Sequence, residues 1–391
     1  MKKIITALLL SLVAANFAFA VEDVRITGEV KTGFLFEQRN EGGETTSYAR
    51  INNNDGDAGM SEGRVRIGIA YELKNIGIRT RFYQDNFNRG TGANDPNLLK
   101  VRTDYFYGYG GTFNNQLKIS AGLLGESPWG TGGPELNQEL EYSGGAPLMG
   151  IRVEWKPLGP LRGLNLGFVL SRSDEGVPWD AKEQFGDLFR ESIVGIAWEH
   201  KYFAFRFAYR FDRDVKSDAV FITGEKFVYR VEERLLWTLL PGMQIWANGY
   251  CEGINSEGRG SGYGPPGYIQ NWLYAHYDSR YFNAGIDAGY RDNFVKKTGQ
   301  LLEIRPSFYY KFINNRLVAG VMGGIVMGFN GSESYPDVFY NNWYVEPLVK
   351  VNIYNNFYIA LVYRYTSNAY QTLGNNDYYT NWFNLRLCYS F

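Results

Sequence analysis

Short segments in which apolar and polar side chains alternate recur from residue 24 to the end of the chain. In the first of them, Val30, Phe34 and Phe36 fall on one face, whereas Glu29 and Lys31 fall on the other. Successive side chains of a β-strand point to opposite faces of the sheet, so a period of two predicts a strand with one apolar and one polar face. Because this period recurs along the whole chain, we expect an all-β fold.

The composition of the two faces distinguishes a membrane barrel from a soluble β-sandwich. Arginine occupies many polar positions, and aromatic residues, which make up 17% of the chain, occupy many apolar positions near strand ends. In a transmembrane barrel, aromatic side chains lie at the two membrane interfaces and the polar face lines water. A polytopic helical membrane protein is excluded, because no long apolar run occurs and the mean hydropathy is −0.32. We therefore predict a transmembrane antiparallel up-and-down β-barrel.

Short turns and long polar connections alternate between the predicted strands. Asn and Gly recur in the turns, where they tolerate the positive φ of tight hairpins. The eight short turns lie at 74–77, 114–115, 157–163, 200–202, 241–242, 278–280, 314–315 and 355–356. The nine long connections lie at 39–60, 86–98, 125–147, 173–190, 213–224, 253–267, 292–300, 331–341 and 367–377. Together they join about 18 strands, with 16 as the alternative, and short periplasmic turns opposite long extracellular loops are typical of outer-membrane barrels.

Some features fit this pattern poorly. Glu233 falls on the apolar face of its strand, and Pro306 and Pro347 lie inside strands, where proline removes a ladder donor. A β-bulge near each proline would accommodate it. The predicted strand at 268–277 has no clean apolar face.

The first 20 residues have the pattern of a secretory signal peptide. Two lysines precede a short apolar stretch at 4–15, and an Ala-Phe-Ala cleavage site follows at 18–20. We therefore expect a cleaved signal peptide at 1–20, a barrel at 21–391, and export through the Sec pathway. The expected destination is the outer membrane of a Gram-negative bacterium.

The last strand carries apolar side chains at alternate positions and ends in phenylalanine: Leu385, Leu387, Tyr389 and Phe391. With the signal peptide and the interleaved turns, this pattern resembles bacterial outer-membrane porins, in which a C-terminal aromatic residue is the sorting signal for barrel insertion. The resemblance implies that these four residues form an assembly signal for periplasmic chaperones and the barrel-assembly machinery. It also implies contact with outer-membrane lipid and lipopolysaccharide, and it leaves monomer and homotrimer open.

Little in the sequence supports an enzyme or a cofactor site. A hydrolase needs a nucleophile and a base at one site, but both histidines, His200 and His276, lie in or beside predicted short turns without a suitable Ser and carboxylate. Asp55 and Asp57 lack the distal glutamate of a calcium loop. Two cysteines exclude a Cys-rich metal site, and a pI near 6.3 gives no footprint for nucleic acid. We expect no catalytic residue, metal or cofactor.

Basic side chains gather on the predicted lumen face of the second to fifth strands. They are Arg64, Arg66, Arg79, Arg81, Arg102 and Lys118. The third long connection, 125–147, has no basic residue and four acidic ones: Glu126, Glu135, Glu139 and Glu141. A transverse field between a basic wall and an acidic loop orients dipolar solutes and filters ions.

In the porins that this chain resembles, the third outer loop folds into the barrel and narrows the pore opposite a ladder of basic side chains. The resemblance therefore implies that 125–147 forms a constriction. The alternative is that the arginines only pair with lumen acids such as Glu72, Asp85 and Asp104, and that the loop lies outside the pore.

Aromatic side chains at predicted lumen positions suggest a second feature. Tyr83, Phe106, Trp246 and Tyr250 could stack against the apolar faces of sugars. The alternative is that they reflect the general abundance of tyrosine, of which the chain has 30.

The sequence thus predicts a porin, a water-filled channel for passive diffusion of small hydrophilic solutes or ions. Two other classes stay open. One is a surface-exposed barrel with a plugged lumen whose loops bind host or environmental ligands. The other, with less support, is an outer-membrane hydrolase.

Overall fold

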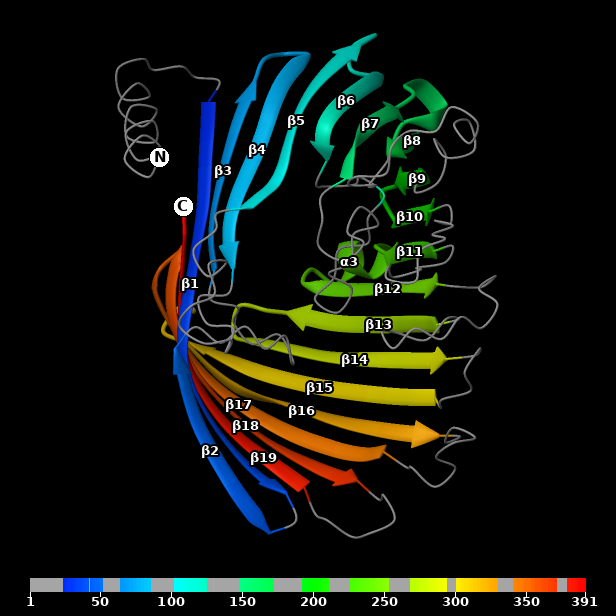
Figure 1. Cartoon of the computed structure of the whole chain (residues 1–391). Helices are drawn as coiled ribbons and strands as arrows, with labels where there is room; N and C mark the ends of the chain where they lie inside the picture. The colour runs from blue at the N-terminus through cyan, green and yellow to red at the C-terminus, as the bar shows by residue number, and fades with distance from the viewer. Residues whose placement is uncertain are drawn as a thin grey trace, which may run out of the picture.

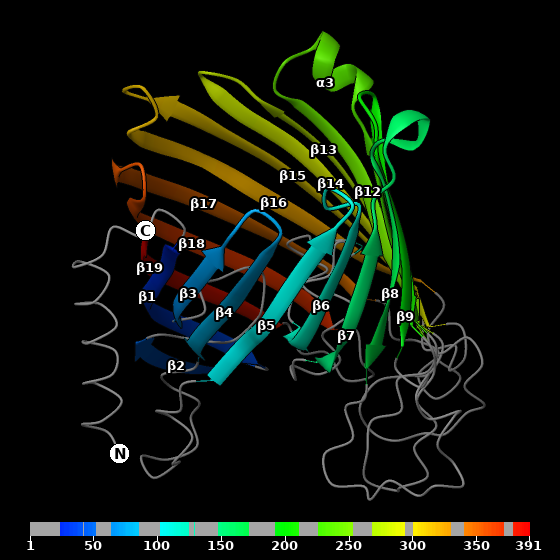
Figure 2. The same cartoon turned by 90° about the horizontal axis from the view of Figure 1, so that it is seen from above.

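The computed structural model is a closed β-barrel (Figure 1, Figure 2). It describes residues 24–41, 43–51, 64–85, 102–124, 129, 148–171, 192–210, 226–252, 268–293, 300–329, 340–370 and 378–391. The strands are β1 (Val24–Glu41), β2 (Glu44–Ile51), β3 (Arg64–Glu72), β4 (Ile76–Asp85), β5 (Arg102–Thr112), β6 (Leu117–Leu124), β7 (Leu148–Trp155), β8 (Leu164–Ser171), β9 (Ile193–Glu199), β10 (Phe203–Arg210), β11 (Lys226–Glu233), β12 (Met243–Glu252), β13 (Tyr268–Asp278), β14 (Phe282–Asn293), β15 (Gln300–Phe312), β16 (Leu317–Phe329), β17 (Tyr340–Tyr354), β18 (Phe357–Tyr370) and β19 (Tyr378–Ser390). The turns contain the 3-10 helix η2 (Gly159–Leu161) and the helix α3 (Leu235–Leu239).

The sheet closes where the first strand meets the last. β1 pairs antiparallel with β19, from Glu29 opposite Ser390 to Glu41 opposite Tyr378. Beyond β19, the Gly28 N–H donates to the carbonyl of Phe391 (2.8 Å), and the Phe391 N–H donates to the carbonyl of Gly28 (2.9 Å). Figure 1 shows the C-terminus beside β1. The predicted antiparallel up-and-down barrel is therefore confirmed.

The first hairpin differs from the expected long connection at 39–60. β1 continues to Glu41, turns tightly at Gly43, whose φ is 86°, and returns as β2. β2 pairs with one part of β1 and β3 with the other part of the same edge, so that Ile51 lies opposite Phe34 and Arg64 opposite Lys31. β2 and β3 thus together take the place of one strand in the barrel wall, here called one barrel position. The predicted number of 18 is confirmed for the positions around the barrel, with one position divided into two strands.

All eight predicted short turns are present. They connect the strands at 73–75, 113–116, 156–163, 200–202, 234–242, 279–281, 313–316 and 355–356. In two of them, 113–115 and 313–315, three consecutive residues have positive φ. The asparagines in these turns tolerate that conformation, but Phe113 and Ile313, each with φ 51°, are bulky residues that rarely adopt it.

The residues that fitted the alternation poorly now have physical explanations. The Glu233 carboxylate accepts a hydrogen bond from the Leu236 N–H (3.0 Å) at the start of α3, where a helix favours negative charge. Asn271 faces outward from β13, and its side-chain oxygen accepts a hydrogen bond from the Tyr229 hydroxyl across Gly249. A polar residue on the outer face is thus satisfied within that face.

The expected bulges at the two prolines are wrong. The register is the same on both sides of Pro306, where Ile304 lies opposite Ile325 and Ser307 opposite Met322. It is also unchanged across Pro347. Pro306 still pairs in register with β14, so the ladder accommodates the missing N–H without inserting a residue.

The two faces of the wall differ in chemistry. Large apolar side chains are exposed on the outer face, for example Ile78 (49%), Phe168 (45%) and Val349 (43%). Charged side chains are buried on the inner face, for example Arg152 and Glu232. Neither helix in the described ranges is long and apolar enough to cross a membrane.

Candidate functional site

The inner face of β3 and β4 carries arginines that the alternation placed there. Arg66 lies opposite Glu29 on β1, Arg79 opposite Ala70, and Arg81 opposite Gly68. The Arg79 Nε donates to the Glu72 carboxylate (2.7 Å). Arg66 forms no ion pair with any residue that the structure describes. The pairing of arginines with lumen acids, which was the alternative to a constriction, is thus present between Arg79 and Glu72. The side chains of Asp85 and Asp104, the other two acids of that alternative, lie outside the described part of the structure.

The backbones of Arg64 and Arg102 also belong to this wall, at the ends of β3 and β5. Arg64 lies in register with Asp85, and Arg102 with Tyr83. Their side chains lie outside the described part of the structure, as does that of Tyr83.

Three tyrosines on β5 lie beneath basic side chains of this wall and are here called the tyrosine strip: Tyr105, Tyr107 and Tyr109. The sequence did not single them out. Tyr105 lies under the Arg81 guanidinium (4.8 Å to the ring centroid), and Tyr109 under the Lys118 ammonium (4.1 Å). Between them, Tyr107 is buried beneath Arg152 (5.5 Å). A cation over an aromatic face is attracted by the ring quadrupole, so this strip holds positive charge on the wall.

A register shift explains why this strip was missed. The pairing of β4 with β5 shifts between Arg81 and Phe82, so that Arg81 lies opposite Tyr105 and Phe82 opposite Thr103. One extra residue in β5 reverses the alternation beyond the bulge. Phe106, which we expected in the lumen, therefore lies on the outer face and is 54% exposed.

Trp129, the one residue of the third long connection 125–147 within the described set, lies against the inner wall. Its side chain is fully buried, and its indole N–H donates to the carbonyl of Asn165 (3.3 Å). The ring lies where side chains at Gly167 and Gly195 would otherwise project, and these two glycines are opposite each other on β8 and β9. Two paired glycines thus form a seat for one tryptophan on the inner wall. The acidic residues Glu126, Glu135, Glu139 and Glu141 lie outside the described residues.

The wall across β11–β15 holds a second set of cations and aromatic rings. Trp246 and Tyr274 stack at 4.8 Å with an interplanar angle of 12°. The Arg230 guanidinium lies 5.4 Å from the Trp246 ring, and that of Arg305 lies 4.4 Å from the Trp272 ring. Each arginine also has an acidic partner. Arg230 pairs with Glu232 (2.6 Å), and Arg305 with Asp287 (3.4 Å).

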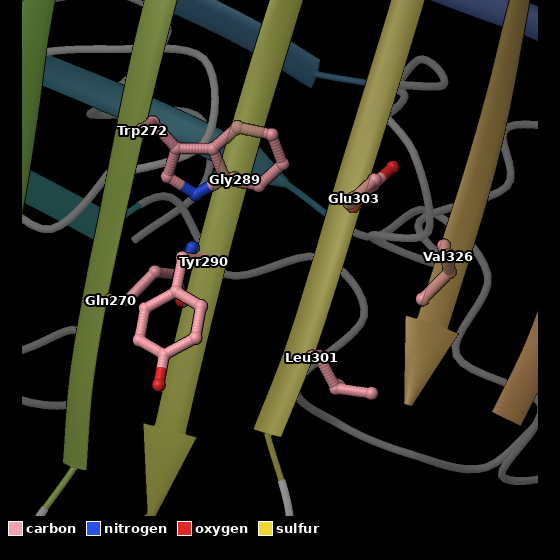
Figure 3. Close-up of a pocket in the computed structure, with 7 residues that line it drawn as sticks. All are labelled: Gln270, Trp272, Gly289, Tyr290, Leu301, Glu303 and Val326. Carbon is pink, nitrogen blue, oxygen red and sulfur yellow. The ribbon is translucent and has the colours of Figure 1, made fainter. Parts of the chain in front are cut away.

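A hollow opens beside this stack. Figure 3 shows the Trp272 ring lying across Gly289 on the next strand, where an added Cβ would meet it at 2.5 Å. Leu301 and Glu303 on β15 and Val326 on β16 line the hollow. The Glu303 carboxylate accepts a hydrogen bond from the Tyr344 hydroxyl (3.1 Å).

The predicted set of sugar-stacking aromatics does not come together. Trp246 stacks on Tyr274, Tyr250 is buried, and Phe106 is on the outer face. The rings that do associate, Trp246, Tyr274 and Trp272, alternate with arginines of the neighbouring strands. The alternation along β11–β15 could place these rings on the inner face. It could not predict that they contact one another, because that depends on how neighbouring strands are aligned.

The histidines do not form a catalytic site with a described nucleophile. His200 accepts a hydrogen bond from the Tyr202 N–H (3.2 Å) in a short turn. His276 has a carboxylate neighbour that we did not expect, because its Nε2 lies 2.5 Å from Asp287. Neither histidine bonds to a Ser, Thr or Cys side chain in the described ranges, and these ranges contain no group of three or more metal-binding side chains. Asp55 and Asp57 lie outside them.

Comparison with known proteins identifies the fold. No model of a protein family matches the sequence, and no curated protein matches it. Among solved structures, the chain is similar to the anion-selective porin from Comamonas acidovorans, with 9% identity, a TM-score of 0.52, and 94% of this chain and 99% of that chain covered. It is also similar to OpdQ of Pseudomonas aeruginosa (10% identity, TM-score 0.51, 95% and 98% covered). A third is OprB of Pseudomonas putida (10% identity, TM-score 0.50, 96% of each chain covered). The chain has the fold of outer-membrane porins.

Proposed function

We propose that this chain, with the fold of an outer-membrane porin, is a passive channel for small hydrophilic solutes or ions in the outer membrane. The observation that carries the proposal is the chemistry of the closed barrel. Its outer face exposes apolar side chains, as lipid requires, while its inner face holds charged and aromatic side chains from nearly every strand. The predicted signal peptide at 1–20 supports export, and the C-terminal pattern supports assembly by the barrel-assembly machinery.

Planar-bilayer recording tests this function. Purified protein is expected to give stepwise conductance increments that are ohmic at low voltage. A barrel that inserts but gives no conductance would favour the rival function, a plugged surface barrel whose loops bind ligands. Hydrolysis of a substrate would favour the enzyme, but the described residues offer no nucleophile next to either histidine.

We further propose that 125–147 forms the constriction. Trp129 supports this, because the side chain of this residue of the connection is buried on the inner wall against Gly167 and Gly195. The cations over the tyrosine strip form the facing wall, and narrow low-dielectric surroundings strengthen the field between opposite charges. The four acidic residues of the connection supply the opposite charge in this proposal.

The charges of the two sides are expected to set selectivity in opposite directions. Replacing Glu135, Glu139 and Glu141 with Gln should shift the reversal potential in a salt gradient toward anion preference, because the basic wall is left unopposed. Arg66→Ala with Arg81→Ala should shift it toward cation preference. Deleting 131–141 should raise single-channel conductance. If all three changes leave conductance and reversal potential as in the wild type, the constriction lies elsewhere.

The tryptophan seat gives an independent test of the same connection. Trp129→Ala is expected to raise open-channel conductance and current noise, because the side chain that fixes the connection to the wall is lost. Gly195→Val should have the same effect without altering the connection, since its side chain would occupy the place of the ring. Gly323→Val, on the outer face of β16, controls for the added Val side chain, because its Cβ would have only ordinary contact with the nearest atom, the Tyr344 carbonyl at 3.5 Å. Equal behaviour of all three variants would contradict the seat.

A further inference from the structure

The eight short turns form one end of the barrel, here called the short-turn rim: 73–75, 113–116, 156–163, 200–202, 234–242, 279–281, 313–316 and 355–356. These residues include no Asp or Glu and seven basic residues: Lys74, Lys156, Arg162, Lys201, Arg234, Arg280 and Arg316. The connections between strands at the other end, which do not include 52–63 within the wall, contain 19 acidic and 10 basic residues. The barrel is therefore strongly polarised in charge along its axis.

The same rim exposes some of the most accessible large apolar side chains of the protein. Leu239 is 71% exposed, and Phe113 and Ile313 are each 70% exposed, whereas Ile325 on the outer wall is 53% exposed. Phe113 and Ile313 stand at turn tips in the left-handed region, an unfavourable conformation for bulky residues. Backbone strain of this kind is often associated with a functional requirement, and here it projects an apolar side chain from the end of the barrel.

Cations and apolar groups are adjacent in these turns. The Lys201 ammonium lies 4.9 Å from the Tyr202 ring, and the Arg280 guanidinium lies 5.6 Å from the Tyr281 ring. Lys156 and Arg234 pair with acids at nearby strand ends. The other five basic residues of the rim form no ion pair with a described residue. Their charge is available to an external anion.

We propose that the short-turn rim binds the headgroups of anionic phospholipids in the leaflet next to it. Apolar side chains at the turn tips enter the boundary between headgroups and acyl chains, and the adjacent Lys and Arg side chains reach the phosphates. The apolar outer face of the wall continues into the rim at Ile76, which is 54% exposed, so lipid already contacts the neighbouring surface. The basic residues are distributed over six of the eight turns around the barrel, which fits a lipid annulus better than a protein partner that covers one sector.

Lipid preference in vesicles tests the proposal on the mature full-length barrel. The wild type is reconstituted into phosphatidylcholine, alone or mixed with phosphatidylglycerol, and the lipid that stays bound is measured by native mass spectrometry. The wild type should retain phosphatidylglycerol in preference to phosphatidylcholine, and the preference should weaken in high salt. Lys74→Gln, Arg280→Gln and Arg316→Gln together should reduce it by at least about fivefold, since each basic residue near a lipid surface contributes to binding.

A matched variant removes the same charge from the opposite end: Arg259→Gln, Lys296→Gln and Lys297→Gln. It should keep the lipid preference of the wild type. Heat-modifiable migration checks that all variants are folded, and Arg280→Gln alone replaces the triple variant if folding fails. Equal retention of both lipids by the wild type, or equal loss in both triple variants, would overturn the proposal and leave a periplasmic protein or cell-wall polymer as the partner of the rim. Conductance should not change in the rim variant, so this result is separate from that of the channel proposal.

Discussion

Deletion of Phe391 is expected to remove nearly all heat-modifiable barrel from the outer membrane. The C-terminal residue closes the sheet through two backbone hydrogen bonds with Gly28. Its ring also lies where a side chain at Gly28 would project, so the glycine leaves room for the ring. Without Phe391, the β1–β19 seam loses its last pair and its aromatic cover. Replacing Leu385, Leu387 and Tyr389 with Ser should weaken the same strand, because it places hydroxyls on its lipid-facing side.

A glycine variant separates closure of the barrel from recognition of the C-terminal sequence. Gly28→Val keeps every residue of the signal but displaces the Phe391 ring, so it should impair refolding of purified protein into detergent or vesicles. Gly108→Val, also on the outer face, is the control, because the nearest atom to its Cβ would be 3.8 Å away. If Gly28→Val refolds like Gly108→Val while the deletion fails only in cells, the terminal residue acts solely as an assembly signal. Normal assembly of both the deletion and the triple Ser variant would contradict the prediction altogether.

Phe207→Arg is expected to destabilise the folded barrel in lipid by roughly 2–4 kcal/mol, the cost of a basic side chain near the bilayer midplane. Phe207 lies in the middle of β10, opposite Ile196 on β9 and Tyr229 on β11, and its ring stacks on Phe227 at 6.1 Å. The outward direction of this position follows from its neighbours, because Ala204 and Ala208 on the opposite parity are buried inside. The shift in the urea or guanidinium unfolding midpoint in vesicles measures the cost.

The control for this prediction is one residue away on the inner face. Arg206→Glu should fold with little loss, because a glutamate there lies opposite Arg230 and next to water. It also loses the ion pair that Arg206 makes with Glu199 (3.1 Å), which at a partly exposed site contributes little. Phe207→Leu controls for the lost ring. Equal penalties for Phe207→Arg and Arg206→Glu would show that the assignment of inner and outer faces is wrong.

The architecture could be predicted because it depends on a local rule. Alternation along each strand fixes which side chains face lipid, and Asn-rich turns fix where hairpins reverse, so strand number and turn positions followed from short stretches of sequence. The alternation rule failed where one extra residue in a strand interrupts the period of two. The bulge in β5 reversed the direction of Phe106 and concealed the tyrosine strip, and β2 was missed because its polar residues resemble a loop.

The lumen site was less predictable, because its contacts join residues far apart in sequence. Nothing near Trp129 indicates that its seat is Gly167 and Gly195, since that contact needs β8 and β9 side by side. The contacts of the opposite wall could not be predicted for the same reason, because Arg305 reaches Trp272 only when β13, β14 and β15 are in register. The basic residues of β3 and β4 were found because they are close in sequence.

The division of one barrel position into β2 and β3 has a consequence for how chains of this kind can change in length. Between Ile51 and Arg64 lie 12 residues, yet their partners on β1, Phe34 and Lys31, are separated by only two residues. The difference between these two lengths is an even number. Residue numbers of the same parity therefore face the lumen in β2 and in β3. Because each half is fixed separately to β1, insertion or loss of residues between them need not change the circumference or the register. The wall thus contains a place where sequence can be gained or displayed without rebuilding the channel.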